Sequence, residues 1–326
     1  MKKTFPLFLT GLALCIGIAC SRNVAPPNTS PKPGFRVLGY LHSYSNIKTD
    51  FQQVDLSLIT DLNIAFVHPD TQGNFTGNPE YTNVISAAHN KNVRVFFSIG
   101  GGSPPPNLGE LVATAGGRDK LVDGIVKLLD TYNFDGVDID LENDLINEHY
   151  APFVYAVARA VKARNKLVTA ALAKWNSDKI ADSTLAKYDF INVMSYDATG
   201  PWNPGKPGPH SPYSMAVNDF KYYTETRKIA PGKILIGLPF YGYGFNGAPT
   251  SMTYKNIIKD HRGSELKDEI NVGGGTVYYN GIPTIESKTK FAVENNAAGV
   301  MIWQLLQDSS DDKSLLKAIN KTLQRP

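Results

Sequence analysis

Cysteine is almost absent from this sequence. Of its 326 residues, only Cys15 and Cys20 carry a thiol, and both lie close to the N-terminus. Disulfide bonds stabilise small secreted folds that cannot build a sufficient core, and this chain has too few cysteines for that strategy. A composition of 42% hydrophobic residues supplies a core instead, and the length suits one large α/β domain or two small ones.

A surplus of one charge sign is also missing. The chain has 33 Lys and Arg residues against 30 Asp and Glu residues, for a net charge of +3, and neither sign forms a long run. Proteins that bind nucleic acid concentrate basic residues on one face or along one helix. The sequence therefore predicts no nucleic-acid partner.

Spacings typical of metal ligands are missing as well. The 6 histidines form no recognisable ligand set. His210 lies among several prolines without a metal-binding partner nearby in the sequence, and we assign it no catalytic role. We expect neither a metal nor an organic cofactor.

An apolar run from Phe5 to Ala19 is too short to favour a membrane-spanning helix. It follows Met1-Lys2-Lys3 and ends before Cys20, an arrangement typical of a secretory signal. The ending Gly17-Ile18-Ala19-Cys20 resembles a bacterial lipoprotein signal, with Gly17 where leucine is usual. We expect residues 1–19 to be removed and Cys20 to be lipidated, leaving a mature chain without a disulfide. The exported protein would then be lipid-anchored to the bacterial cell envelope, at the outer membrane and facing the periplasm or the surface; plain secretion is the alternative.

Residues 20–34 are rich in Pro, Asn and Ser and contain almost nothing to bury. Such a composition is typical of an extended, semi-rigid tether. The folded domain is expected to span residues 35–326.

Strand-like apolar runs alternate with amphipathic segments along this domain. The clearest helical segment is Arg118–Tyr132, in which Leu121, Ile125 and Leu129 recur on one face. The remaining helices are expected at Pro79–Asn90, Glu148–Arg164, Met215–Lys228, Thr284–Asn296 and Asp312–Leu323. Strands are expected at Phe35–Tyr40, Leu62–Val67, Arg94–Ile99, Gly136–Leu141, Leu167–Leu172, Phe190–Met194, Ile234–Pro239 and Gly299–Trp303. Eight strand-then-helix units predict an α/β fold, a parallel eight-stranded (β/α)8 TIM barrel, with an open doubly wound sheet as the alternative.

The segment Asn246–Ile282 interrupts this rhythm after the seventh strand. We expect an elaborated loop that is too short for a separate domain. It includes a hairpin strand at Thr276–Tyr279 that turns at Asn280-Gly281.

Acidic residues alternate along the fourth strand. Side chains on a strand point alternately to opposite faces, so Asp138, Asp140 and Glu142 share one face. That face must point into the barrel, with Glu142 at the carboxyl end of the strand, where such barrels keep their active sites. Like charges this close do not all ionise cheaply, so at least one carboxyl should keep its proton near neutral pH. A protonated carboxyl is what glycosidic bond cleavage requires of its acid.

Two other interpretations of this acidic strand remain open. Its oxygen atoms could bind a hard cation, which prefers oxygen ligands. The three carboxyls could also form a structural network whose hydrogen bonds are satisfied by neighbouring groups.

The octet from Asp135 to Glu142 resembles the D-x-x-D-x-D-x-E signature of family 18 glycoside hydrolases, the chitinases and their relatives. Further segments that resemble the family follow in its order, and the resemblance extends from Phe35 to Asp308. These segments are Ser98-Ile99-Gly100-Gly101, Met194-Ser195-Tyr196-Asp197, Gly200-Pro201-Trp202 with His210-Ser211-Pro212, Gly237-Leu238-Pro239-Phe240-Tyr241-Gly242, and Gly299-Val300-Met301-Ile302-Trp303.

The resemblance implies a role for each matching residue. Glu142 would be the general acid and later the general base. Asp140 would support the N-acetyl group of the substrate, with Asp138 behind it sharing a proton, and Tyr196 would donate a hydrogen bond to the acetamido carbonyl. Residues expected to bind the sugar or line its pocket are Trp303, Asp197, Met194, Tyr40, Trp202, Tyr241, Gly100 and Gly101, the two glycines mainly by permitting a tight turn.

The resemblance also implies the reaction. A retaining hydrolase of β-1,4-linked N-acetylglucosamine polymers or oligomers would use the substrate's own acetamide through an oxazolinium intermediate. The alternatives are an endo-β-N-acetylglucosaminidase acting on N-glycans, a hydrolase of peptidoglycan glycan strands, or a chitin-binding lectin. Tyr243 stands where many members carry arginine, and the short Asn246–Ile282 segment implies an open groove that favours endo-type or short-oligomer cleavage. We expect a monomer whose partner is a polysaccharide or glycan containing N-acetylglucosamine.

Overall fold

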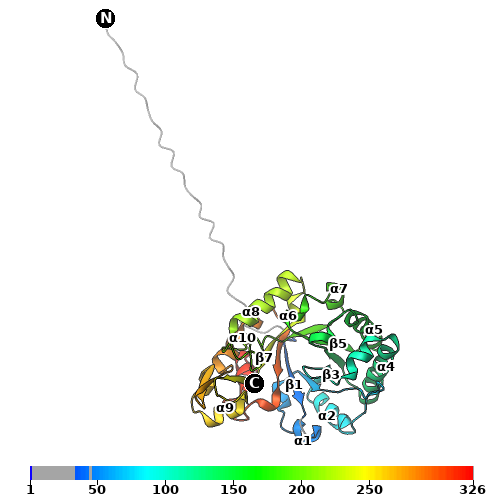
Figure 1. Ribbon diagram of the computed structural model, residues 1–326, viewed down its shortest axis with the longest axis horizontal. Helices are drawn as coiled ribbons and strands as arrows, with labels where there is room; N and C mark the ends of the chain where they lie inside the picture. The colour runs from blue at the N-terminus through cyan, green and yellow to red at the C-terminus, as the bar shows by residue number, and fades with distance from the viewer. Residues whose placement is uncertain (2–33, 44–45, 326) are drawn as a thin grey trace.

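Eight parallel strands close into a barrel in the order β1-β12-β7-β6-β5-β4-β3-β2 (Figure 1). The structure is a computed structural model that describes residues 1, 34–43 and 46–325, so the expected signal peptide and tether, with Cys20, lie outside the described residues apart from Met1 and Gly34. Closure of the sheet confirms the predicted TIM barrel and rules out the open sheet. The barrel strands are β1 (Arg36–His42), β2 (Asp61–Ala65), β3 (Arg94–Gly100), β4 (Gly136–Asp140), β5 (Leu167–Leu172), β6 (Phe190–Val193), β7 (Ile234–Pro239) and β12 (Gly299–Trp303).

Each strand is buried on both faces, as parallel barrels require. On β1, Val37 and Leu41 belong to the large apolar cluster between strands and helices, whereas Leu38 and Tyr40 belong to a smaller cluster in the barrel interior. The same alternation on β4 places Val137 outside. The barrel interior is therefore filled with packed side chains, and its polar residues lie among apolar ones.

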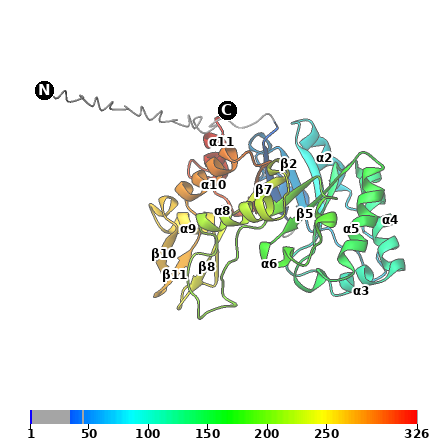
Figure 2. The ribbon, with the colours of Figure 1, turned by 90° about the horizontal axis from the view of Figure 1, so that it is seen from above.

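Helices surround the barrel (Figures 1 and 2), and their buried apolar residues belong to the large core cluster. The predicted helix at Arg118–Tyr132 begins three residues earlier, because Thr114 caps it by accepting a hydrogen bond from the Gly117 amide at 3.1 Å. The segment predicted as one helix at Met215–Lys228 changes to a π-helical turn at Tyr222–Thr226. The helices are α1 (Ile47–Phe51), α2 (Glu80–His89), α3 (Asn107–Ala113), α4 (Ala115–Tyr132), α5 (Tyr150–Lys162), α6 (Lys174–Ser177), α7 (Asp182–Leu185), α8 (Tyr213–Lys221), α10 (Ile282–Glu294) and α11 (Leu315–Thr322).

The segment after β7 is more ordered than the elaborated loop predicted from the sequence. It forms an antiparallel sheet in the order β10-β11-β8-β9 with one short helix, to one side of the barrel (Figure 2). These elements are β8 (Tyr241–Phe245), β9 (Ser251–Thr253), α9 (Tyr254–Asp260), β10 (Glu269–Val272) and β11 (Gly275–Tyr278).

The hairpin turn predicted at Asn280-Gly281 is wrong. The chain turns at Gly273 and Gly274, between β10 and β11. Both have positive φ, 61° and 86°, and tight hairpin turns require such values at their central residues. Glycine adopts them without steric cost, and Asn280 is instead buried, where its side chain binds neighbouring backbone.

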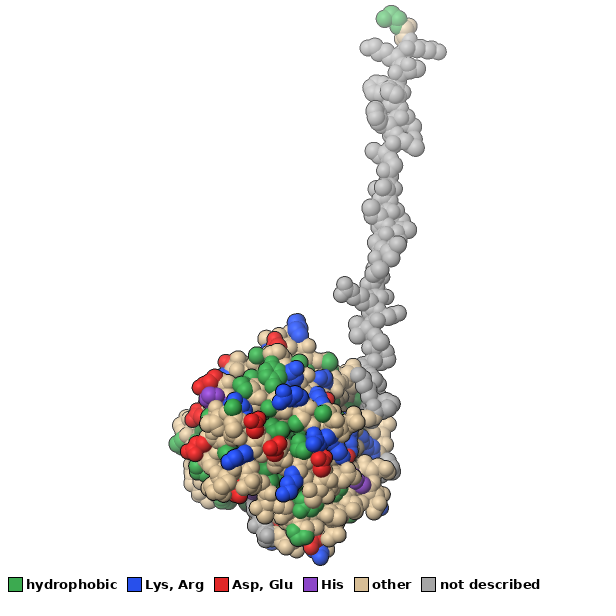
Figure 3. Space-filling model, turned by 90° about the vertical axis from the view of Figure 1, so that its right-hand side faces the viewer, with side chains coloured by type: hydrophobic (Ala, Val, Ile, Leu, Met, Phe, Trp, Pro, Cys, Tyr) green, Lys and Arg blue, Asp and Glu red, His purple; other side chains and the backbone are tan. Residues whose placement is uncertain are grey.

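No helix in the described part of the chain is long and apolar enough to cross a membrane. On the face shown in Figure 3, Lys and Arg are interspersed with Asp and Glu, in keeping with the small net charge. The guanidinium of Arg325, near the C-terminus, donates to the Phe35 carbonyl at 2.5 Å, so the two ends of the folded domain meet where β1 begins.

Candidate active site

Three carboxyls of the fourth strand reach the predicted end of the barrel. Asp138 and Asp140 lie on β4 and are buried inside it, while Glu142 follows the strand and begins a short 3₁₀ turn at Asn143–Leu145. Above them a cavity of about 300 Å³ opens at the carboxyl ends of the strands. It is lined by Tyr40, Phe66, Gly102, Asp140, Glu142, Ala171, Met194, Tyr196, Asp197, Tyr241, Tyr243, Ser251, Trp303 and Gln307.

Asp138 is the deepest of the three carboxyls and accepts four hydrogen bonds. Oδ2 accepts from the Tyr40 hydroxyl at 2.7 Å and from the Ser98 hydroxyl at 2.8 Å. Oδ1 accepts from the Thr169 hydroxyl at 2.6 Å and from the Asn192 amide at 3.1 Å. Burial raises the pKa of Asp138 above its ordinary value, although these four hydrogen bonds oppose the shift. Four donors fit an ionised carboxylate, which only accepts.

Asp140 and Glu142 occupy a different environment. Burial, followed by the charges of Glu142 and Asp138, raises the pKa of Asp140 well above its ordinary value. Asp140 Oδ1 is buried and has no hydrogen-bond partner. Burial, followed by the charge of Asp197, raises the pKa of Glu142 to about 7. Glu142 therefore keeps a proton near neutral pH at the cavity surface.

The resemblance implied that Asp138 shares a proton with Asp140. Within the described residues, no hydrogen bond joins these two carboxyls, and the oxygens of Asp138 are occupied by hydroxyl and amide donors. Thr169 and Asn192, which supply two of those donors, were not singled out in the sequence because they lie on β5 and β6 outside any motif.

Asp197 is held by three side chains on the opposite wall. Its Oδ1 accepts from the Tyr241 hydroxyl at 2.5 Å and lies 3.2 Å from Nδ1 of His210, and its Oδ2 accepts from the Tyr243 hydroxyl at 3.5 Å. His210, to which the sequence assigned no role, is completely buried and contacts this carboxyl. Tyr243, which stands where many family members carry arginine, faces the same carboxyl.

Aromatic rings form the floor and one wall of the cavity. The Trp303 ring lies 5.5 Å from the Tyr40 ring and 5.6 Å from the Phe66 ring, which it stacks on at 30°. Phe66 was not predicted. Tyr196 is buried, and burial raises its pKa well above the ordinary value, so its hydroxyl stays protonated as a donor. Met194 lies beside it and lines the same cavity.

The two predicted glycines shape the backbone under the cavity. Gly100 and Gly101 both have positive φ, 112° and 81°. The Gly101 amide donates to the Asp140 carbonyl at 2.7 Å, and a Cβ on Gly100 would lie 2.1 Å from that same oxygen. These glycines bring the end of β3 against the end of β4, and Gly102 rather than either of them lines the cavity.

Two exposed tryptophans lie in segments that follow β5 and β6. The Trp202 side chain is 60% exposed and its ring meets the Tyr243 ring edge to face at 5.1 Å. Trp175, which was not predicted, is 47% exposed on α6, directly after β5. Both follow strands whose carboxyl ends surround the cavity. Exposed rings in such places suit stacking on sugar rings.

The hard-cation interpretation of the acidic strand fits these contacts poorly. A hard cation needs several carboxylate or carbonyl oxygens pointing at one place. All four hydrogen-bonding groups around Asp138 are donors, and no group of three or more metal-ligating side chains occurs among the described residues. The arrangement instead suits proton transfer by Glu142 next to a buried carboxyl and a tyrosine donor.

The sequence matches the model of glycosyl hydrolases family 18 over residues 36–308, and the chain belongs to that family. The fold agrees with solved structures of the family. The GH18 chitinase ChiB of Flavobacterium johnsoniae is 33% identical with a TM-score of 0.80, and the match covers 89% of this chain and 94% of that one. A chitinase from Bacteroides thetaiotaomicron is 30% identical with a TM-score of 0.78, covering 89% and 96%.

Among curated proteins, Chitinase 63 of Streptomyces plicatus is 29% identical over 238 residues. That match covers 58% of this chain and spans 38% of the relative's length. The alignment thus compares part of a longer protein with the barrel described above.

Proposed function

We propose that this protein is a retaining glycoside hydrolase that cleaves β-1,4-linked N-acetylglucosamine chains with the substrate's own acetamide as nucleophile. The observation that carries the proposal is the environment of Glu142. Its pKa is raised to about 7 at the surface of a sugar-sized cavity lined by Trp303 and Tyr196. A carboxyl that keeps its proton near neutral pH serves as an acid for a leaving glycosidic oxygen.

The other carboxyls of the cavity are poorly suited to be the nucleophile. Asp197 is occupied by Tyr241, His210 and Tyr243, and Asp140 is almost completely buried below Glu142. A retaining hydrolase without a free carboxylate nucleophile needs another one, and the 2-acetamido oxygen of the substrate is correctly placed to attack the anomeric carbon.

In the first step, Glu142 donates its proton to the glycosidic oxygen while the acetamido oxygen bonds to the anomeric carbon. The leaving sugar departs and an oxazolinium ion forms. Tyr196 donates a hydrogen bond to the acetamido carbonyl, and Asp140 accepts one from the acetamido N–H as positive charge develops there. In the second step, Glu142 takes a proton from water, which opens the ring with retained configuration.

The substrate class follows from the aromatic lining and from the relatives. Trp303 supplies a flat apolar floor for the sugar beside the cut bond, and the exposed ring of Trp202, which contacts Tyr243 of the cavity wall, is available to stack on a further sugar. The relatives compared above are named chitinases. Chitin oligomers are therefore favoured over the chitobiose core of N-glycans and over peptidoglycan strands.

Mass spectrometry of the products from chitin oligomers, an N-glycoprotein and peptidoglycan tests this proposal. The wild type should release N-acetylglucosamine oligomers from chitin fragments, and Glu142→Gln should release almost none while still folding. Glu148→Gln is a matched control because the Glu148 side chain is 80% exposed at the surface. Binding of chitin oligomers without any turnover by the wild type would show a lectin instead.

The envelope location is part of the proposal. We propose that Cys20 carries a lipid and that residues 20–34 connect it to the barrel. The lipoprotein-like ending Gly17-Ile18-Ala19-Cys20 supports this.

A further inference from the structure

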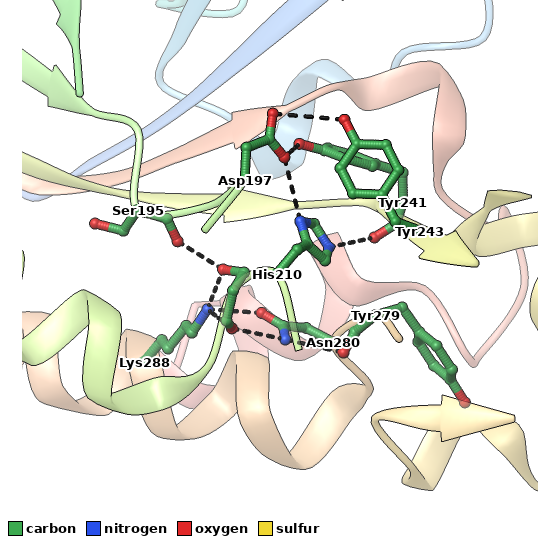
Figure 4. A network of polar contacts seen from close by, with 9 residues as sticks. Ser195, Asp197, His210, Tyr241, Tyr243, Tyr279, Asn280 and Lys288 are labelled. Atoms are coloured by element: carbon green, nitrogen blue, oxygen red, sulfur yellow. Dashed lines mark hydrogen bonds and ion pairs between the residues drawn. The ribbon is translucent and has the colours of Figure 1, made fainter. Parts of the chain in front are cut away.

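Lys288 is a completely buried cation on α10, outside the cavity. Its ammonium group donates three hydrogen bonds of 2.7 Å, to the Ser211 carbonyl, the Ser211 hydroxyl and Oδ1 of Asn280 (Figure 4). The lysines that form ion pairs with carboxylates among the described residues are Lys48, Lys162, Lys290 and Lys313, and Lys288 is not one of them. A lysine buried at such cost needs a full set of hydrogen bonds.

The three oxygen atoms that contact the Lys288 ammonium all act as acceptors. The Ser211 hydroxyl uses its own proton to donate to the Ser195 carbonyl at 2.6 Å. The Asn280 amide group donates to the carbonyls of Ser211 and Tyr279, both at 3.0 Å, so its oxygen is the atom left to accept. Three acceptors require three N–H donors, and only the charged ammonium has them.

The charges of two carboxyl groups, Asp268 and Asp219, act on the Lys288 ammonium without forming a hydrogen bond to it. Burial lowers the pKa of Lys288 to about 7, while the charges of Asp268 and Asp219 raise it. Asp268 precedes β10 and Asp219 lies on α8, so the ammonium is supported from both neighbouring elements.

The network continues directly into the cavity wall. Ser211 fixes the carbonyl of Ser195, the residue before Tyr196. The neighbouring His210 accepts a hydrogen bond from the Ala198 amide through its carbonyl at 2.9 Å, and its ring lies between Asp197 Oδ1 at 3.2 Å and the Tyr241 carbonyl at 3.3 Å (Figure 4). Each ring nitrogen therefore lies within hydrogen-bonding distance of an oxygen atom of the cavity wall.

The segment from Ser195 to Ala198, which Ser211 and His210 hold, contains an uncommon backbone conformation. Asp197 has φ 63°, in the left-handed region that non-glycine residues seldom adopt. Such a conformation persists where surrounding contacts determine it. The contacts of Ser211 and His210 fasten the chain on both sides of Tyr196 and Asp197.

We propose that Lys288 is a positioning residue for catalysis, which acts through Ser211 to fix the backbone that presents Tyr196 and Asp197 to the substrate. This inference rests on the proposed function. Tyr196 contacts the acetamido group only in a correctly aligned complex, and a misplacement of about 1 Å costs on the order of 100-fold in rate. Loss of the ammonium should therefore lower kcat more than it weakens binding.

The test compares Lys288→Met with Lys290→Met. Both changes lie on α10, but the Lys290 side chain is 64% exposed and pairs with Glu294 at the surface. We measure kcat on a chitin oligomer well below each melting temperature, and the Kd of the same oligomer by calorimetry in the Glu142→Gln background. We expect kcat to fall about tenfold or more in Lys288→Met with Kd within about threefold, and Lys290→Met to match the wild type.

Ser211→Ala keeps the buried charge of Lys288 but removes the hydrogen bond from the Ser211 hydroxyl to the Ser195 carbonyl. This variant therefore tests the same inference if Lys288→Met does not fold. It should lower kcat in the same direction by a smaller factor, and a crystal structure should show residues 195–198 displaced. Wild-type kcat per folded molecule in both variants would overturn the inference, since a purely structural lysine changes stability alone. A wild type that cleaves no glycan would instead overturn the proposed function.

Discussion

Neighbouring carboxyls on one strand have different properties because their surroundings differ. Asp138 accepts four hydrogen bonds in the barrel interior, whereas Asp140 has an oxygen without a partner beside two other acids. Glu142 lies at the cavity surface with its pKa raised to about 7. Pairs of acids whose environments separate their pKa values mark the acid and base roles in hydrolases.

The pH dependence of activity follows from Glu142. The acid must be protonated in the free enzyme, so kcat/KM should fall tenfold per pH unit as pH rises above about 7. Asp197→Asn removes a negative charge that raises this pKa, so ionisation becomes easier and the alkaline limb should move to lower pH. Kinetic profiles from pH 5 to about 9 measure both effects. A plateau up to pH 9 in the wild type would contradict Glu142 as the acid.

At the residue scale, the motifs predicted the acidic residues but only some of the side chains that hydrogen-bond to them. Asp138, Asp140, Glu142 and Tyr196 stand in segments with recognisable spacing, and the structure brings them to one end of the barrel. Thr169 and Asn192, which donate to Asp138, and His210, which contacts Asp197, come from other strands and loops. Barrel closure brings these together, and no local pattern in the sequence reports it.

At the element scale, the join between β3 and β4 depends on one glycine. A Cβ on Gly100 would lie 2.1 Å from the Asp140 carbonyl oxygen, and its φ of 112° is unfavourable for alanine. Gly100→Ala should destabilise the fold by about 2–4 kcal/mol, measured by denaturant unfolding. Gly116→Ala on α4, where a Cβ meets no atom within 4 Å, should change stability by less than about 1 kcal/mol. Equal stability of the two variants would contradict this account of the join.

The strands were predictable because each is a short apolar run between polar segments. All eight barrel strands lie within two residues of their expected bounds. The segment after β7 was harder, because its strands are short and partly exposed, and its turn uses Gly273 and Gly274 rather than the Asn-Gly pair that usually marks hairpins. Short helices such as α6 and α7 were missed because four residues show no period.

At the scale of the whole molecule, the start of the domain lies away from the site. Phe35 precedes β1 and contacts Arg325, whereas the cavity lies at the carboxyl ends of the strands. The folded domain therefore begins at the end of the barrel away from the cavity.

Cys20→Ser tests the anchor. Without a lipidated cysteine the protein should move from the membrane fraction to the soluble fraction of fractionated cells, as detected by immunoblot. Turnover of soluble oligomers by the purified barrel should stay unchanged, because Cys20 lies outside the barrel. An unchanged membrane fraction for Cys20→Ser would contradict lipidation at this residue.

The most direct test of the mechanism compares fully N-acetylated and fully deacetylated chitin oligomers of equal length. Their rates of hydrolysis under identical conditions measure whether the substrate supplies the nucleophile. The account predicts turnover of the acetylated oligomer and no detectable turnover of the deacetylated one. Comparable rates on both would contradict acetamide participation, whatever the role of Glu142.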